Sequence, residues 1–167
     1  MTLFQWELIG ALFVSVSGSL LHFVYCWSGK QRVVAFFSPI NESTWEHLKL
    51  LFFPSLLFSF LEYGFIGRSV PGFFTAKCLG ILAGMFFIVG TFYLYTGIIG
   101  HHFLAADICV FLIGVEASHF FALREFLNPR TLPSSFGIAA LIFLLGLFVV
   151  FTVHPPQIAL FSDPQSK

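Results

Sequence analysis

The chain has 167 residues, of which 57% are apolar and only 10% are charged. An ordinary soluble domain carries about 25% charged residues, so this composition excludes a water-soluble surface and favours a chain that lies in lipid. The 25 phenylalanines point the same way, because a soluble fold of this length would have to bury nearly all of them in one core. Eight basic and eight acidic residues balance to a net charge of zero, which excludes the basic face that a nucleic-acid partner requires.

Long apolar runs predict transmembrane helices, since a helix needs about 20 residues to cross the hydrocarbon layer of a bilayer. The runs are continuous and do not alternate, which favours an all-α bundle over a β-barrel. We expect a single integral membrane domain over residues 1–167, with an interfacial loop at 28–43 that roofs part of the bundle. The five expected spans lie at about 6–27, 46–66, 76–96, 103–123 and 136–153.

The first run has no basic leader, and its only early charged side chain is Glu7. These features favour an uncleaved anchor over a secretory signal. Small residues recur along this run at helical spacing, and His22 continues the same stripe. We therefore expect His22 to face other helices and not lipid.

The second run follows a dense polar segment, Asn41-Glu42-Ser43-Thr44-Trp45-Glu46-His47-Leu48-Lys49. Charged groups are costly near lipid, so four ionisable side chains in so short a segment need a reason. One structural reason is a capping box, in which Ser43 and Glu46 satisfy free backbone amides at the start of a helix. Near the far end of the same run, we expect Glu62 to reach the interface and meet Arg68.

The last three runs differ in how they should pack. Gly80 and Gly84 in the third run form the small-xxx-small pattern that lets helices approach closely, either within the chain or in a homo-oligomer. The fourth run carries Asp107 on one face and Glu116 with His119 on another, which predicts a position in the middle of the bundle. The fifth run has no ionisable group, so we expect a peripheral helix that faces lipid broadly.

Antiparallel threading assigns each helix end to one of two membrane faces. Five of the six histidines fall on one face, although they come from four separate parts of the sequence. We therefore predict a polar cavity at this face, formed by His22, Asn41, Glu42, Ser43, Glu46, His47, Tyr95, His102 and Asp107. Neutral imidazole and carboxylate oxygen are ordinary ligands of zinc. The candidate ligands of such a divalent metal are His22, His47, Glu42, Glu46 and Asp107.

Asp107 is the hardest of these residues to explain without a function. It lies more than a turn inside its span, where a charged aspartate costs roughly 2.5 to 3.5 kcal/mol on insertion scales unless a partner or a water-filled cavity offsets it. A Ser-His-acid triad could be assembled from Ser43, His47 and Asp107, but the sequence has no nucleophile elbow.

Several motifs together resemble a family of small uncharacterised bacterial membrane proteins, catalogued as a domain of unknown function. The motifs are His22-Phe23-x-Tyr25-x-Trp27-Ser28, Ser38-Pro39-x-Asn41-Glu42-Ser43-x-Trp45-Glu46-His47-Leu48-Lys49, Tyr95-Thr96-Gly97, Pro155-Pro156 and Leu160-Phe161-x-Asp163-Pro164. The resemblance covers almost the whole chain. It implies a multi-pass protein of the bacterial cytoplasmic membrane and brings no known activity.

A shorter segment, Asn41-Glu42 with Trp45-x-His47-Leu48, is similar to the Asn-Glu-Thr…Trp-Thr-His-Leu segment of progestin and adiponectin receptor-like proteins. Their superfamily includes zinc-dependent membrane amidases. Here the interval between Glu42 and Trp45 is two residues shorter, five spans replace seven, and the paired-histidine metal helix is missing.

Two hypotheses of different classes remain open at this point. In the first, a non-enzymatic membrane module uses the polar cavity to bind an ion, a lipid headgroup or a partner helix. In the second, a metal-dependent intramembrane hydrolase acts on a lipid-like or amide substrate.

Overall fold

A computed structural model of the protein describes residues 1–128 and 132–163, so Pro164 of the last motif lies outside the described residues. Within these ranges the chain is all-helical and has no strand, as predicted. The long helices are α1 (Leu3–Trp27), α2 (Thr44–Phe65), α3 (Phe73–Ile99), α4 (Leu104–Leu127) and α5 (Ser134–Val153). Three short 3-10 helices, η1 (Val34–Phe36), η2 (Gly67–Ser69) and η3 (Ala159–Phe161), lie in the connections.

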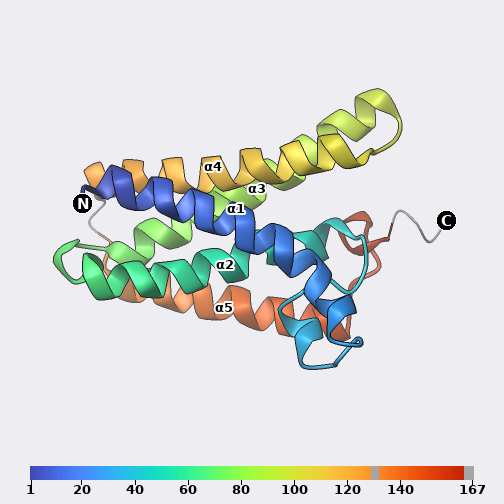
Figure 1. Ribbon diagram of the computed structural model, residues 1–167, viewed down its shortest axis with the longest axis horizontal. Helices are drawn as coiled ribbons and strands as arrows, with labels where there is room; N and C mark the ends of the chain where they lie inside the picture. Colours follow the sequence, from blue (N-terminus) through green and yellow to red (C-terminus); the bar gives the residue numbers. More distant parts are fainter. Residues whose placement is uncertain (129–131, 164–167) are drawn as a thin grey trace.

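Each of the five long helices is long and apolar enough to cross a membrane, which confirms the expected number of spans among the described residues. They run side by side along the long axis of the molecule in alternating directions (Figure 1). The third span is longer than expected, Phe73–Ile99 against 76–96, because the helix continues beyond its most apolar part to Gly100, which has φ +86°. That left-handed conformation suits glycine and ends the helix.

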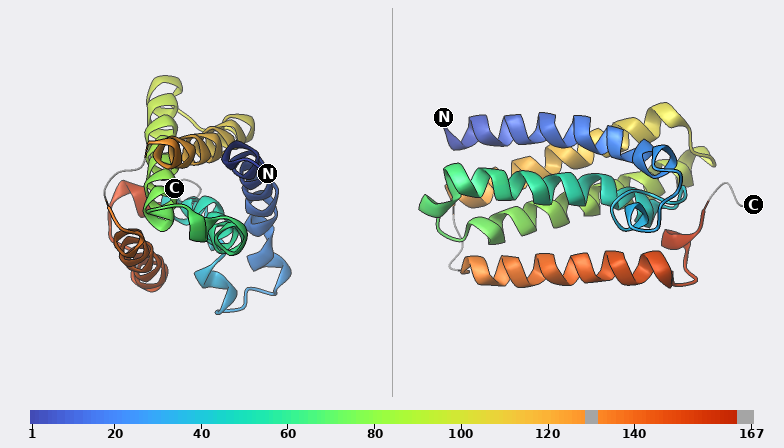
Figure 2. Two further views of the ribbon diagram at one scale, coloured as in Figure 1. Left: turned by 90° about the vertical axis from the view of Figure 1, so that its left-hand side faces the viewer. Right: turned by 60° about the horizontal axis from the view of Figure 1, so that its bottom comes forward.

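The helices pack in pairs around α2 and α3. Viewed end-on, α3 and α4 cross closely, α1 lies against α2, and α5 stands at the edge (Figure 2). Among the five helices, α2 has the largest buried share, so α2 rather than α4 is the central helix. The outer side of α5 exposes large apolar side chains such as Ile142, Phe143 and Val150, which confirms the expected peripheral helix.

The glycines of α3 bring its backbone against that of α4. A Cβ atom on Gly80 would lie 2.4 Å from the carbonyl oxygen of Ser118, and one on Gly84 would lie 2.6 Å from that of Gly114. Only residues without a side chain permit this approach. Of the two contacts that the Gly80 and Gly84 pattern allows, the structure shows the one within the chain, because α4 fills this face.

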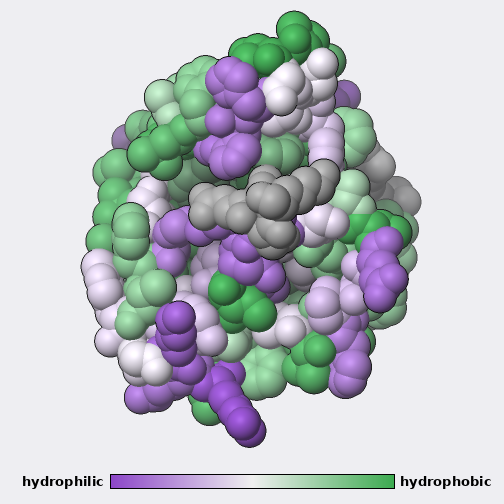
Figure 3. Space-filling view, turned by 90° about the vertical axis from the view of Figure 1, so that its right-hand side faces the viewer, coloured by the Kyte–Doolittle hydropathy of each residue, from purple (hydrophilic) through white to green (hydrophobic). Residues whose placement is uncertain are grey.

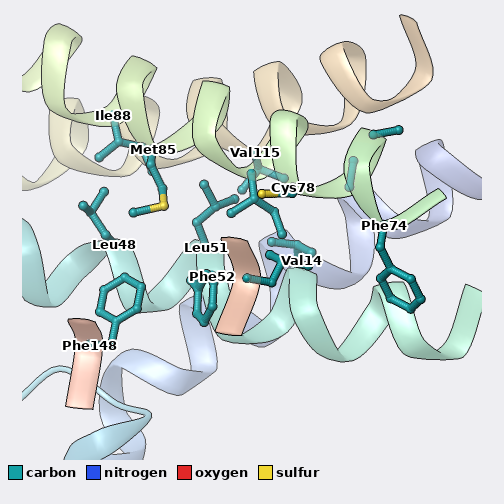
Figure 4. Close-up of a cluster of buried hydrophobic side chains, with 14 of the residues drawn as sticks. Val14, Leu48, Leu51, Phe52, Phe74, Cys78, Met85, Ile88, Val115 and Phe148 are labelled. Atoms are coloured by element: carbon teal, nitrogen blue, oxygen red, sulfur yellow. The ribbon is translucent and has the colours of Figure 1, made fainter. Parts of the chain in front are cut away.

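A continuous apolar core joins all five helices (Figure 4). Leu51 and Phe52 of α2, Val14 of α1, Val115 of α4 and Phe148 of α5 are all fully buried in it. Such close packing holds the helix ends in fixed positions. The end of the bundle that carries the C-termini of α1 and α3 gathers hydrophilic residues, with apolar residues along parts of its rim (Figure 3).

Candidate metal centre

Three of the predicted site residues meet at the polar end of the bundle. His22 comes from the last third of α1, Glu42 from the loop before α2, and His47 from the first turn of α2. The two Nε2 atoms of His22 and His47 are 3.3 Å apart. The Oε2 atom of Glu42 lies 3.3 Å from Nε2 of His47 and 3.8 Å from Nε2 of His22. These atoms lie within 4.8 Å of one another and could hold one metal ion.

The spacing of these atoms fits the coordination shell of zinc. Nitrogen and oxygen ligands bind zinc at about 2.0 to 2.2 Å, so two ligands on a tetrahedron lie about 3.3 to 3.6 Å apart. Two of the three separations equal the lower value, and the third, 3.8 Å, exceeds the upper one only slightly. An ion could therefore be bound with side-chain shifts of a few tenths of an ångström.

A hydrogen bond from His47 to the backbone leaves Nε2 of the ring available to bind a metal ion. Nδ1 of His47 lies 3.0 Å from the carbonyl oxygen of Ser43. A carbonyl oxygen only accepts, so Nδ1 must carry a proton and donate it. In the neutral ring the lone pair is then on Nε2, which faces His22 and Glu42. Metal-binding histidines are commonly oriented by such a bond.

Glu42 supplies a negative charge at this point. Hydrogen bonds from His22 and then His47 hold the pKa of the Glu42 carboxyl well below its usual range, so the group is ionised at neutral pH. The hydrogen bond from His47 to Glu42 requires a second proton on that imidazole, at Nε2. Without this proton the Nε2 lone pair lies beside an ionised carboxylate, which is repulsive unless a cation lies between them. Either a proton on an imidazole or a metal ion relieves this repulsion.

Glu46, although a candidate ligand, contacts other groups. Its Oε2 atom lies 2.6 Å from Nζ of Lys49 and accepts a hydrogen bond from the backbone of Ile40 at 3.0 Å. The Ser43 hydroxyl accepts a hydrogen bond from the Glu46 amide at 3.4 Å and so caps the start of the helix. In the expected capping box the Glu46 carboxylate would also accept from the Ser43 amide, but it accepts from the Ile40 amide instead. The structure thus places Glu46 where it holds the loop.

Other side chains of the polar segment complete the attachment of this loop. Asn41 accepts a hydrogen bond from the amide of Ser43 at 3.0 Å. Lys49 is fully buried and donates to the carbonyl oxygen of Ala35 at 2.9 Å. Ser38, also fully buried, donates to the carbonyl oxygen of Leu21 at 2.6 Å and thereby ties the loop to α1. These bonds fix the position of Glu42.

The remaining predicted residues form a second polar group beside the first. Asp107 of α4 accepts hydrogen bonds from the hydroxyl of Tyr95 and from Nδ1 of His102, the latter at 3.1 Å. These partners offset the cost of an aspartate in this helix. A recess of about 70 Å³ lies between the two groups, with Glu42 and His47 on its walls together with His102 and Asp107.

A second opening also borders two of the candidate ligands. It has a volume of about 440 Å³ and is lined by His22, Glu42 and Asn41 together with Lys30 of the loop. Glu42 lines both hollows. The candidate metal centre therefore borders both hollows, which are called here the inner recess (about 70 Å³) and the outer vestibule (about 440 Å³).

A buried ionic cluster near the opposite end of the bundle was not predicted. Lys77 lies between Glu7 and Glu62, and His119 contacts Glu7. The expected pairing of Glu62 with Arg68 is wrong, because Glu62 points into the bundle and its Oε2 atom lies 2.5 Å from Nζ of Lys77. This cluster could have been predicted from one feature of the sequence, because four different spans each carry an ionisable residue toward the same end of the bundle.

These features together fit the class of multi-pass integral membrane proteins: five apolar helices, with a cluster of two histidines and a glutamate at one end. A family model described as a family of unknown function, DUF6512, matches residues 1–166, and the chain belongs to this family. No curated protein and no solved structure matches the chain. The family brings no activity with it, so function must be argued from the geometry.

Proposed function

We propose that this membrane protein binds a divalent transition-metal ion, best fitted by zinc, through His22, Glu42 and His47 at one membrane face. The observation that carries the proposal is the set of separations among the three ligand atoms, 3.3, 3.3 and 3.8 Å. The sequence left three kinds of binding partner open, namely an ion, a lipid headgroup and a partner helix. This geometry favours the ion.

The charge and exposure of the ligands support the same proposal. Two neutral imidazoles and one carboxylate suit zinc, and three protein ligands leave one position for water. The side chains of His22, Glu42 and His47 are 33%, 39% and 30% exposed, so an ion could reach them from the outer vestibule. Taken with the family resemblance, the proposal concerns a protein of the bacterial cytoplasmic membrane.

Metal content tests the proposal directly. The full chain, purified in detergent, is loaded with zinc, dialysed and analysed for bound metal. We expect one equivalent in the wild type, and at least about a 100-fold loss of affinity in His22→Ala, Glu42→Gln and His47→Ala. His101→Ala is the matched control, because His101 is an exposed histidine on the same face. A wild type without metal after loading, or equal loss in the control, contradicts the proposal.

A metal-dependent hydrolase is the second candidate, and the inner recess favours it. Zinc with an open position lowers the pKa of bound water to about 7. The opposite wall of the recess carries Asp107 bonded to His102, a pair that can take up a proton from such a water. The apolar residues Leu50, Phe92 and Val110 line the same recess, which suits a lipid-like or amide substrate.

Asp107→Asn separates the two candidates. The variant should bind zinc as the wild type does, because Asp107 is not among the three clustered ligands. If the protein is a hydrolase, the zinc-loaded wild type should cleave a fluorogenic N-acyl amide lipid, and Asp107→Asn should lose most of that activity. Zinc binding without turnover of such lipids would leave ion binding as the function and contradict the hydrolase.

A further inference from the structure

Four helices each contribute one ionisable side chain to a buried cluster far from the candidate metal centre. Nζ of Lys77 lies 2.5 Å from Oε1 of Glu7 and 2.5 Å from Oε2 of Glu62. The other oxygen of Glu7, Oε2, lies 2.6 Å from Nδ1 of His119. The four side chains thus form a chain in the order Glu62, Lys77, Glu7, His119. Glu7 and His22 are 15 residues apart in α1, which separates the two sites by roughly 22 Å along the helix.

The surroundings of this cluster are apolar. Glu62 is fully buried, and the side chains of Glu7, Lys77 and His119 are 4%, 4% and 8% exposed. The rings of Phe58, Phe73 and Phe126 lie 5.4 to 5.8 Å from the ammonium group of Lys77. Helix α5 contributes no ionisable group. A net charge in such surroundings would be costly.

Charge balance requires one additional proton in the cluster. Lys77 is one positive charge, whereas Glu7 and Glu62 ionised together are two negative charges. Neutrality is therefore reached in two ways, either with a proton on Glu62 or with a second proton on His119. In the second form His119 keeps its Nδ1 proton, which faces Glu7, and adds one at Nε2.

The hydrogen-bond pattern identifies the same two positions. Five buried side-chain atoms of the described residues have no hydrogen-bond partner, and three of them belong to this cluster, namely Oε1 and Oε2 of Glu62 and Nε2 of His119. Oε2 of Glu62 is an ion-pair contact of Lys77 without hydrogen-bond alignment. Buried polar atoms without partners are uncommon and call for an explanation. In this cluster they lie at the two ends of the chain, on Glu62 and on His119, which are the residues that can receive the proton.

We propose that Glu62, Lys77, Glu7 and His119 form a proton-binding site that holds one exchangeable proton, carried either by Glu62 or by His119. A recess of about 130 Å³ lined by Glu7, His119 and the exposed Glu116 connects the site with its surroundings. This volume admits water, which needs about 10 to 15 Å³ by the same kind of measure. The proton therefore exchanges at the His119 end of the cluster, where this recess lies.

Isotope-edited spectroscopy of the full chain in nanodiscs tests this proposal. At neutral pH the wild type should show either a protonated carboxyl band that shifts with ¹³C-labelled glutamate, or a histidine whose ¹⁵N signals are those of an imidazolium ion and that is lost in the Glu62→Gln variant. Detection of either signal in the wild type needs no variant, so it is independent of any folding defect. A wild type with neither signal overturns the proposal.

The substitution Glu62→Gln identifies the origin of the signal. It removes one negative charge with almost no change in shape, so Glu7 and Lys77 then balance each other and the extra proton is no longer required. We expect the signal seen in the wild type to disappear completely. Glu116→Gln is the matched control and should leave it unchanged. An unchanged signal in folded Glu62→Gln, or loss of the signal in Glu116→Gln, contradicts the assignment.

Discussion

The pair of Lys49 and Glu46 provides a quantitative test of how the loop before α2 is held. Both side chains are almost completely buried, and Nζ of Lys49 lies 2.6 Å from Oε2 of Glu46. In Lys49→Met the carboxylate of Glu46 loses its cation, and the carbonyl oxygen of Ala35 loses its donor. Breaking one partner of a buried ion pair costs about 3 to 5 kcal/mol, so we expect the free energy of unfolding to fall by this amount.

Removing both charges should be much less harmful than removing one. In the double variant Lys49→Met/Glu46→Leu no charge is left buried, although Ile40 loses its acceptor. We expect the double variant to recover at least about half of the loss, because replacing a buried pair by apolar residues is often nearly neutral. Denaturant unfolding in mixed micelles measures all four members of the cycle.

Zinc affinity should fall in Lys49→Met and fall less in the double variant, because the loop that this pair holds carries Glu42. Exposed ion pairs contribute less than about 1 kcal/mol to stability. If the free energy of unfolding of Lys49→Met fell by less than this amount, the view that the pair anchors the loop would be refuted.

Three other changes probe the helix contact and the candidate ligands. Gly84→Ala should destabilise the bundle by about 1 to 3 kcal/mol, because the new Cβ would lie 2.6 Å from the carbonyl oxygen of Gly114. Gly90→Ala, where nothing lies within 4 Å, should be neutral or stabilising in the same unfolding assay, and equal losses in both variants would contradict the α3–α4 contact. Zinc affinity should fall as the pH is lowered from neutrality, because protons compete with zinc for imidazole nitrogen, and constant affinity from about pH 7 to about pH 5 would exclude imidazole ligands. The lowered pKa of Glu42 stabilises the metal-free fold above the unfolded pKa of about 4.3, and this contribution is lost as the pH falls through the folded value. Glu42→Gln should therefore show a weaker acid destabilisation than the wild type, and identical acid profiles would contradict this role.

The number of helices and the gathering of histidines at one end could be predicted from the sequence. Helix number follows from the length of apolar runs, and the membrane face of each helix end follows from alternating directions. His22 and His47 accordingly meet, although 25 residues separate them in the sequence.

The rotation of each helix about its axis could not be predicted in the same way. The sequence favours a contact of Glu62 with Arg68, which lies in η2 just beyond the end of α2. In the folded chain Glu62 faces Lys77 instead, because α2 is the central helix and α3 packs against it. Sequence patterns show which residues share a helix face, but not which neighbouring helix that face meets.

The roles of Glu46 and of the α3 glycines were hidden for a related reason. Glu46 has the spacing of a capping residue and the chemistry of a metal ligand, and only the folded loop shows that Lys49 and Ile40 use its carboxylate. Gly80 and Gly84 have a pattern that serves internal and intermolecular contacts equally well. The position of α4 decides between them.

X-ray absorption at the zinc edge of the loaded full-length protein tests the central claim most directly. We predict a first shell of nitrogen and oxygen atoms only, at about 2.0 to 2.2 Å, with the outer-shell signature of two imidazoles. A shell without imidazole, or one with sulfur at about 2.3 Å, would contradict it, because Cys26 lines the outer vestibule and would then be the ligand instead.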